Sequence, residues 1–484
     1  MRKILLVIIM IGILVIAGCD SGNSSSQKDK IDYLKDMPQM TTENIQLTYV
    51  TCESDKLARE LARKFEKEYP NIKVNVISVG KEYLEETIKA INENNQSLDC
   101  FIYTDCDDML SNNYLYDMTE YWEADKENSN LIPSIDEAKL GYFGTDSKLA
   151  TPMVYYPGIF YVSKPTIEKL WMDMPDLDWT WEEMIKIIKE ATRVFSKEQH
   201  YGLCSYKKIY EYYDVAMSLS SIGPMGYDGH TFNLDNWVKG VKQYQELMDT
   251  GCIVGPHIDE DDMWSCGSIW MGESGQVAIL LEEFYAYLNH IDIEYSYNLG
   301  YVPYVIPTKK GIQGEEAYTT CTMYMGGISS NSAHPREAYE LLKFMGWGVD
   351  GWKARLEIYK DETIVCEQTM EPLYRSYMPA PLTLDEGIWI EYKKFFYDGA
   401  ENIRYWDYYF DNCLRGIPDG ICSIPGYSKF HKEYFGTYEL KEEFYDSIDS
   451  GQIDIDILAA EIEAKLEQYH KEAMKEYFDI DISD

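Results

Sequence analysis

The sequence predicts an α/β protein built from two lobes, and three observations lead to this prediction. The chain of 484 residues exceeds the roughly 100–200 residues of one typical domain, which favours two units. Its hydrophobic fraction of 45% is enough for a core in each unit, which excludes a disordered chain. Strand-like and helix-like apolar periods alternate along its first third, as they do around a parallel sheet.

The segment from residue 45 to residue 103 carries the clearest alternation. Apolar residues at every second position predict strands over 45–49 and 72–76, and an apolar run predicts a third strand over 98–103. Apolar residues at helical spacing predict helices over 57–65 and 84–91. The order β-α-β-α-β implies a parallel sheet with right-handed crossovers. Ligands of such sheets gather at the carboxyl ends of the strands.

A second region begins after residue 152 and continues the mixed pattern. Thr180 and Glu183 form a predicted capping box at the start of a helix, and Asp228-Gly229 is typical of a turn. Apolar runs predict strands over 158–162, 275–282 and 301–307. Helical periods predict helices over 184–191, 237–248, 338–345 and from about 454 to 469.

The charge balance restricts the partners of this chain. It has 44 Lys and Arg against 83 Asp and Glu, so the formal charge is −39. A nucleic-acid backbone requires a basic surface, so we expect no nucleic-acid partner. No apolar run of 18 residues follows the first twenty residues, which argues against a protein that spans a membrane several times.

The N-terminus predicts export and a lipid anchor. Arg2 and Lys3 precede the uncharged run 4–18, which has the form of a signal peptide. The run ends in Ala17-Gly18-Cys19, which resembles the lipobox of bacterial lipoproteins and implies acylation of Cys19 in an extracytoplasmic, membrane-anchored protein. The alternative is an ordinary signal peptide with a chance cysteine. The polar residues 20–44 are typical of a flexible tether.

The other ten cysteines show no metal-binding or disulfide framework. No CxxC pair exists, so we expect no structural zinc, and mostly free, buried thiols. Cys413 and Cys422 flank a short loop with glycine and proline and are the pair that could form one bridge. The acidic run Asp259–Asp262 lacks the ligand spacing of a calcium loop and is interpreted as a solvated loop.

Several stretches together resemble one family, the bacterial extracellular solute-binding proteins of ABC importers, in its maltose-binding-like family 1. Each stretch is weak alone, but their order, their spacing and the lipobox are specific, and they cover about residues 45 to 350. The stretches are Ile45–Val50, Phe65–Val74, Leu98–Ile102, Ile159–Lys164, Trp179–Glu183, Gly275–Ile279, Gly326–Asn331 and Arg336–Ala338.

The resemblance implies a two-lobed, periplasmic-binding-protein-like (Venus flytrap) fold with crossing hinge strands and a ligand cleft between the lobes. The first lobe would take residues 45–152 and 306–350, and the second lobe 153–305 and 351–484. It further implies a monomeric protein without enzymatic activity that closes around its solute and docks on permease subunits. Because a partner hydrolyses ATP, the chain would need no cofactor.

The family's ligand contacts, carried onto this sequence, give a set of candidate site residues. Tyr outnumbers Phe by 42 to 15 and there are 11 Trp, and amphipathic rings suit sugars. We therefore expect a sugar or oligosaccharide as the solute. The candidates are Glu53, Asp105 and Asp107 at strand ends, Tyr155 and Tyr156 at the crossover, Glu283 and Tyr285 after the 275–282 strand, and Trp389 as a stacking ring.

Two alternatives stay open from the sequence. An acidic cleft would also suit a cationic solute such as a polyamine. A surface-anchored glycoside hydrolase with paired carboxylates is the other alternative. Carboxylate pairs arise by chance among 83 acidic residues, and the chain has no GxSxG, HExxH or GxxxxGK[ST] motif, so the sequence gives the enzyme no support.

Overall fold

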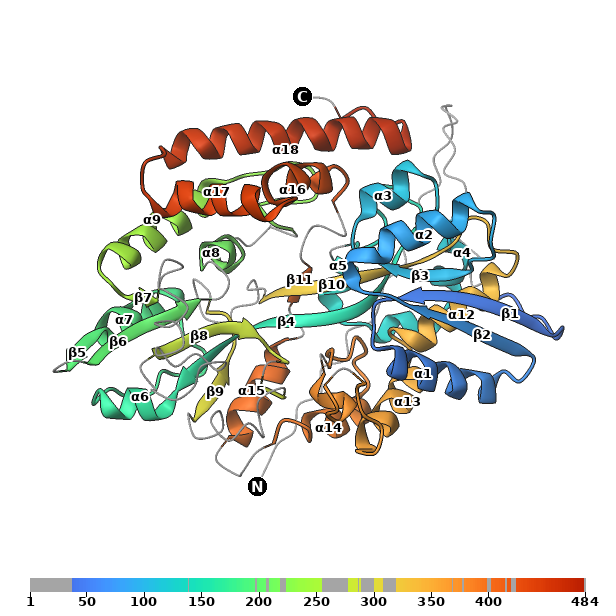
Figure 1. Ribbon diagram of the computed structural model, residues 1–484, viewed down its shortest axis with the longest axis horizontal. Helices are drawn as coiled ribbons and strands as arrows, with labels where there is room; N and C mark the ends of the chain where they lie inside the picture. Colours follow the sequence, from blue (N-terminus) through green and yellow to red (C-terminus); the bar gives the residue numbers. More distant parts are fainter. Residues whose placement is uncertain are drawn as a thin grey trace, which may run out of the picture.

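The computed structural model describes residues 37–482, and within this range it omits a set of short segments. These segments are 138, 196–197, 206–208, 218–222, 255–276, 286, 289–299, 308–318, 368, 377, 398–401, 414–415 and 419–423. The described chain forms two lobes that lie side by side and are joined by long strands (Figure 1).

The first lobe begins with the β-α-β-α-β unit that the sequence predicts. Strand β1 pairs in parallel with β2 on one side and with β3 on the other. Helix α1 buries Leu57, Leu61 and Phe65, which recur every four residues and therefore form one face against the sheet. The elements are β1 (Ile45–Thr51), α1 (Asp55–Glu68), β2 (Ile72–Ser78), η1 (Lys81–Tyr83), α2 (Leu84–Glu93) and β3 (Cys100–Tyr103).

Short helices follow β3 before the chain leaves the first lobe. Asp105 caps the first of them with its own side chain, which accepts hydrogen bonds from the amides of Asp107 and Asp108. These elements are α3 (Cys106–Ser111), α4 (Thr119–Ala124), η2 (Lys126–Asn130) and α5 (Pro133–Glu137).

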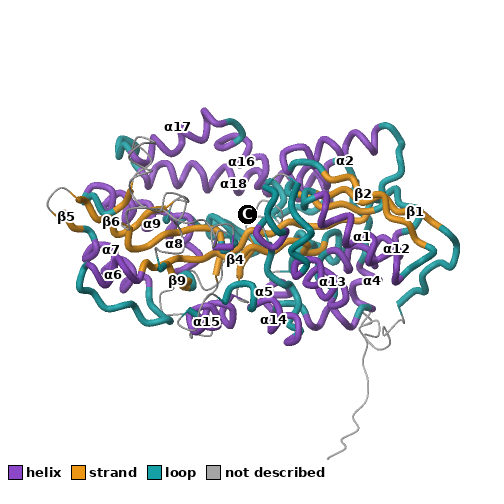
Figure 2. Tube along the Cα trace, turned by 60° about the horizontal axis from the view of Figure 1, so that its bottom comes forward, coloured by secondary structure: helices purple, strands orange, loops and turns teal. Residues whose placement is uncertain are grey.

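Two long antiparallel strands connect the lobes, as the predicted hinge strands should. The first part of β4 (Thr151–Ser163) pairs with β10 (Thr319–Ile328), and its second part pairs with β8 and β9 of the second lobe. Strand β10 also pairs with β3 of the first lobe, so β10 and β4 together link the strands of the two lobes. The resulting sheet has the order β2-β1-β3-β10-β4-β8-β6-β5, and it runs through the whole molecule (Figures 1 and 2).

The second lobe packs helices around its half of the sheet. Thr180 and Glu183 form the predicted capping box at the start of α7. The strands are β5 (Arg193–Phe195), β6 (Glu198–Ser205), β7 (Ile253–Val254), β8 (Val277–Glu283) and β9 (Tyr301–Tyr304). The helices are α6 (Lys164–Lys169), α7 (Trp181–Ala191), α8 (Tyr210–Met217) and α9 (Asp235–Asp249).

The C-terminal part of the chain contributes to both lobes. Helix α13 packs against α1 and α12 of the first lobe, whereas α15 packs against β9 of the second lobe. The buried apolar side chains from Ile424 to Leu466 join the core cluster of the second lobe. The elements are α12 (Pro335–Met345), α13 (Val349–Lys360), η4 (Leu373–Arg375), α14 (Glu386–Lys393), α15 (Ile403–Cys413), β11 (Gly416–Pro418), α16 (Tyr427–Phe435), α17 (Tyr438–Asp449) and α18 (Ile455–Phe478).

This packing bears on the expected lobe boundaries at residues 152, 306 and 350. The expected second lobe includes 351–484, whereas α13 packs against α1 and α12 of the first lobe and α15 packs against β9 of the second lobe. We therefore propose that the C-terminal boundary between the lobes lies between α14 and α15.

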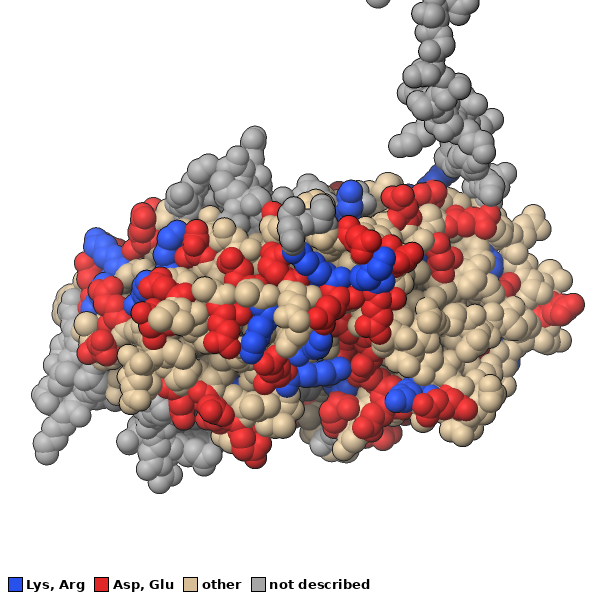
Figure 3. Space-filling view, turned by 90° about the horizontal axis from the view of Figure 1, so that it is seen from above, with Lys and Arg blue, Asp and Glu red and all other residues tan. Residues whose placement is uncertain are grey.

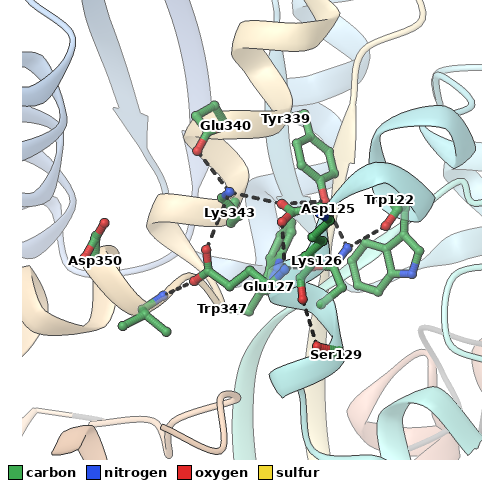
Figure 4. A network of polar contacts seen from close by, with 12 residues as sticks. Trp122, Asp125, Lys126, Glu127, Ser129, Tyr339, Glu340, Lys343, Trp347 and Asp350 are labelled. Atoms are coloured by element: carbon green, nitrogen blue, oxygen red, sulfur yellow. Dashed lines mark hydrogen bonds and ion pairs between the residues drawn. The ribbon is translucent and has the colours of Figure 1, made fainter. Parts of the chain in front are cut away.

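A charged network fixes α12 to the loop before α5. The Nζ atom of Lys343 lies 3.0 Å from Asp125, 3.1 Å from Glu340 and 3.6 Å from Glu127 (Figure 4). The lysine side chain is only 15% exposed. One ammonium therefore pairs with three carboxylates in a largely buried position, and we call this group the Lys343 network.

The described cysteines agree with the expectation of free thiols. Cys52, Cys100, Cys106, Cys204, Cys252, Cys321 and Cys366 are all unbridged. The suggested Cys413–Cys422 bridge and the acidic run Asp259–Asp262 involve residues outside the described part of the chain. Among the described helices, none is both long enough and apolar enough to cross a membrane.

Candidate ligand-binding site

Glu53 lies beyond the carboxyl end of β1 and is held by a buried ion pair. Its Oε1 and Oε2 atoms accept hydrogen bonds from the two terminal nitrogens of Arg355 on α13, at 2.6 and 3.3 Å. Arg355 also donates to the carbonyl oxygen of Met345 at 2.7 Å. Burial acts to lower the pKa of the Arg355 guanidinium, but the Glu53 carboxylate and the Tyr359 hydroxyl together outweigh burial and raise that pKa above its ordinary value. Glu53 is thus a fixed anion with a partner of its own.

Three tyrosines gather where the hinge strands meet the end of β8, and we call them the tyrosine cluster. They are Tyr156 on β4, Tyr285 directly after β8, and Tyr324 on β10. The ring centroid of Tyr156 lies 5.1 Å from that of Tyr285 and 6.2 Å from that of Tyr324, in both cases edge to face. Tyr156 pairs with Thr322, so Tyr324 is its diagonal neighbour on the same face of the strand pair.

The tyrosine cluster and Glu53 face one region. Burial, followed by the influence of Tyr324 and Glu53, raises the pKa of Tyr156 well above its ordinary value. Its hydroxyl therefore stays protonated and can donate a hydrogen bond. The Nζ atom of Lys81, which follows β2, lies 4.9 Å from the centroid of the Tyr324 ring. All three rings are half-buried, so they combine stacking surface with access from outside.

Asp105 and Asp107 have a different environment, because both contact helix α16 of the other lobe. Asp107 accepts hydrogen bonds from the amides of Gly426 and Ser428, at 2.7 and 3.2 Å. Asp105 accepts from the Ser428 hydroxyl and lies 2.7 Å from the Nζ atom of Lys432. Burial raises the pKa of Asp107 to about 7, against the opposing effect of the two amides. These carboxylates join the lobes.

Of the remaining predicted residues, Tyr155 and Trp389 do not join the tyrosine cluster. Tyr155 is 1% exposed and belongs to the hydrophobic core. Trp389 is 8% exposed, packs against Tyr392 and Phe410, and donates from Nε1 to the carbonyl oxygen of Thr383. In this structure Trp389 is therefore a core residue rather than an accessible stacking ring. The backbone of Glu283 pairs with Gly158, and its side chain lies outside what the structure describes.

A cavity of about 900 Å³ lies elsewhere along the boundary between the lobes. The loop 139–149 of the first lobe, the turn 227–230 of the second lobe and the end of α18 line it, and none of the predicted ligand residues does. Ligands of α/β proteins bind at the ends of strands, so we favour the tyrosine cluster over this cavity as the candidate ligand site. Within the described residues, no cluster of three His, Cys, Asp or Glu side chains could hold a metal ion.

The face that carries α16 and α18 has mixed charge. Figure 3 shows Lys and Arg side chains lying between Asp and Glu side chains over this face, without a separate basic patch. Many of the basic groups are paired, as Lys429 is with Glu472 and Lys465 with Glu433. Among its described residues, this face therefore offers no basic surface of the kind that a polyanion requires.

Residues 53–346 match the family described as bacterial extracellular solute-binding proteins. The chain belongs to this family. The match begins at Glu53 and covers β3, the hinge strands and the tyrosine cluster of the solute-binding protein. No curated protein matches the sequence.

Solved structures of ABC solute-binding proteins share the fold at low sequence identity. The sugar-binding protein MalE from Xanthomonas citri has a TM-score of 0.63 at 12% identity and covers 88% of this chain and 98% of its own. An ABC substrate-binding protein from Listeria monocytogenes, in complex with cycloalternan, has a TM-score of 0.59 at 16% identity, with 88% and 99% covered. The GacH receptor of Streptomyces glaucescens has a TM-score of 0.58 at 13% identity, with 88% and 99% covered. The two-lobed fold with crossing hinge strands is thus confirmed.

Sequence reasoning missed several residues of this region. Tyr324 lies on β10, and the alternation of Thr320, Thr322 and Tyr324 with Cys and Met residues is a strand signal that could have identified it. Arg355 and Ser428 carry no such signal, because their partners lie about three hundred residues away in the sequence.

Proposed function

We propose that this solute-binding protein captures a sugar or oligosaccharide between its lobes and delivers it to the permease of an ABC importer. The observation that supports this most is the tyrosine cluster at the junction of the hinge strands and β8, beside the Glu53–Arg355 pair and Lys81.

The chemistry of this region suits a carbohydrate. The faces of sugar rings carry C–H groups that stack on tyrosine rings, and the phenol groups can hydrogen bond with sugar hydroxyls. The edge-to-face arrangement of Tyr156 with Tyr285 and Tyr324 presents rings in more than one plane. Such a site can contact several faces of one sugar or two successive sugar units.

The position of the cluster links binding to closure. Tyr285 follows a strand of the second lobe, Tyr156 and Tyr324 lie on the hinge strands, and Glu53 and Lys81 belong to the first lobe. A solute that contacts both lobes binds the closed arrangement more tightly and shifts the population toward it. The closed form would be the one that docks on the permease subunits.

Two of the structurally similar proteins support a carbohydrate as the class of solute. The Listeria protein was solved with cycloalternan and the Streptomyces receptor with acarbose, and both ligands are oligosaccharides or close analogues. We extend this solute class to the present chain, as a non-enzymatic carbohydrate-binding protein that acts as a monomer.

The proposed location is extracytoplasmic. We propose that Cys19 is acylated and that residues 20–44 separate the lipid anchor from the first strand, which begins at Ile45. Cys19 and most of the tether lie outside the described residues.

The test is a thermal-shift screen of the soluble chain from residue 20 against sugars and polyamines. A solute at about 100 times its Kd stabilises the folded protein by about 2.7 kcal/mol, which is readily detected. We expect oligosaccharides to raise Tm with little dependence on salt. A shift by spermidine alone that disappears at high salt would overturn the carbohydrate proposal in favour of the polyamine alternative. Product analysis of the same mixtures by chromatography tests the glycoside hydrolase alternative.

A further inference from the structure

Helix α16 of the second lobe begins against helix α3 of the first lobe. Both α16 and α18 pack against α3, so this boundary joins elements from the two core clusters (Figures 1 and 2). Asp107 and Ser428 are 7% and 3% exposed at this boundary, although both are polar. Their burial therefore depends on contact between the lobes.

The first turn of α16 lacks a cap of its own. Its N-cap residue is Gly426, which has no side chain and adopts a φ of 88°. A helix N-terminus leaves amides without partners inside the helix, and a side-chain oxygen at the N-cap normally accepts from one of them. Here the Asp107 carboxylate of the other lobe accepts from Gly426 and Ser428 at 2.7 and 3.2 Å.

A second carboxylate of the same loop extends the contact. Asp105 accepts from the Ser428 hydroxyl and pairs with Lys432 one turn further along α16, at 2.7 Å. Asp105 also caps its own helix α3, so its orientation is fixed from the first lobe. We call Asp105 and Asp107, together with Gly426, Ser428 and Lys432, the interlobe cap.

We propose that Asp105 and Asp107 are positioning residues for lobe closure, which cap helix α16 across the boundary and favour the closed arrangement without touching the solute. The proposal rests on the proposed function only in that closure is the step that binds the solute. When the lobes separate, the carboxylates and the α16 amides exchange these partners for water. Their contribution therefore differs between the open and the closed arrangement, as a group that biases a two-state equilibrium must.

Lys432 and Lys429 provide a matched pair of variants. Their side chains are 56% and 57% exposed on the same helix, but Lys432 reaches Asp105 of the first lobe whereas Lys429 pairs with Glu472 of α18 in its own lobe. Lys432→Met removes an ion pair between the lobes, Lys429→Met removes one within a lobe, and Lys432→Arg retains the charge across the boundary. Ser428→Ala is a second variant that removes the hydroxyl donor to Asp105.

Hydrogen exchange and small-angle scattering of the solute-free protein give the decisive readouts. For Lys432→Met and Ser428→Ala we expect the amides at the start of α16 to exchange about three to ten times faster, with a larger radius of gyration, because each variant removes one contact with the Asp105 carboxylate. Lys429→Met and Lys432→Arg should match the wild type. Equal exchange and equal radii for Lys432→Met, Ser428→Ala and Lys429→Met would overturn the proposal.

Sugar affinity is a further measurement, and it distinguishes a role in lobe closure from a purely structural role. With acarbose and cycloalternan as probes, Lys432→Met should weaken binding about three- to tenfold at unchanged Tm of the solute-free protein, and Lys429→Met should not. If neither sugar binds the wild type, the proposed solute class loses support, while exchange and scattering still decide the interlobe cap. The two proposals therefore fail separately.

Discussion

Removing Arg355 should destabilise the protein far more than removing an arginine from a surface ion pair. Arg355 is 2% exposed and donates four hydrogen bonds, two to the Glu53 carboxylate, one to the carbonyl oxygen of Met345 and one to the hydroxyl of Tyr359. Arg355→Met retains the packing of the side-chain stem but leaves the Glu53 carboxylate, 9% exposed, without its cation. Breaking a buried pair in this way costs about 3–5 kcal/mol.

The matched control is Arg59→Met on helix α1. Arg59 also pairs with a carboxylate, that of Asp55 at 2.7 Å, but the two side chains are 48% and 46% exposed. A surface pair contributes about 0–1 kcal/mol, so urea unfolding should separate the two variants clearly. Similar free energies of unfolding for both variants would refute the assignment of Glu53–Arg355 as a stabilising buried pair.

A double-mutant cycle tests the role of Glu53 at the same time. Glu53→Gln together with Arg355→Met should recover part of the loss, with an interaction energy of about 1–3 kcal/mol, because residues in direct contact are not additive. Titration with sugar then separates two roles for Glu53. A positioning role predicts lower stability with little change in affinity of the folded fraction, whereas a ligand contact predicts the reverse.

Four further predictions address other regions of the molecule. Tyr285→Ala should cost about 2 kcal/mol or more of sugar binding by calorimetry, as a buried aromatic anchor does, and strong destabilisation with unchanged affinity would instead make the ring a core residue. Lys343→Met should lower the free energy of unfolding in urea by about 3 kcal/mol, because it leaves the carboxylates of Asp125, Glu127 and Glu340 without their shared cation, and a loss of no more than the roughly 0–1 kcal/mol of a surface pair would contradict the charge argument. Burial raises the pKa of Asp107 from 3.8 to about 7, so closure takes up a proton and solute affinity should be highest at low pH and decrease as pH rises to about 7. Asp107→Asn should remove this pH dependence of the affinity and leave only the contribution of other groups such as the buried His470. A variant with the pH profile of the wild type would contradict the assignment to Asp107. Cys19→Ala should move the protein from the membrane to the soluble fraction without changing affinity, and persistent anchoring would mean that the apolar segment is not cleaved.

The pH prediction depends on the groups that surround Asp107. Asp105 raises the Asp107 pKa, Lys432 and the amides of Gly426 and Ser428 lower it, and burial outweighs them. Tyr477 of α18 also faces this carboxylate, and its own pKa is raised above the ordinary value, so it stays neutral over the range of the test. Protonated Asp107 retains oxygen lone pairs for the α16 amides and no longer carries a buried charge. The interlobe cap is therefore compatible with tighter closure at low pH.

Local periodicity predicted the elements whose apolar residues form one face. The strands at 45–51 and 72–78 and the helix at 55–68 follow directly from that signal, and so does their parallel pairing. Helix α13 gives no such signal, because Gly351, Trp352, Arg355 and Tyr359 are buried on several sides of it. Its place against the first lobe was therefore not predictable from pattern, and neither was the partner of Glu53.

The candidate site shows the same division between local and long-range information. The strand-end rule pointed to Glu53, and the family resemblance pointed to Tyr156 and Tyr285; the structure brings these residues into one region. It could not indicate that Trp389 is buried, because a tryptophan on a short helix has the same local pattern whether it faces a cleft or a core. The Nε1 hydrogen bond to Thr383 and the packing on Phe410 decide the matter, and both depend on tertiary structure.

Asp105 and Asp107 show why a strand-end carboxylate in a two-lobed protein has two possible partners. The end of a strand in one lobe faces either the solute or the other lobe, and the sequence around residues 104–108 is compatible with both. The distinguishing signal lies at the other end of the chain, where α16 begins with Gly426 and so lacks a capping side chain. Buried amides at a helix start require an acceptor, and a glycine N-cap means that the acceptor comes from elsewhere in the fold. Accounting for those amides leads to Asp107, and through it to a contact that connects the two lobes.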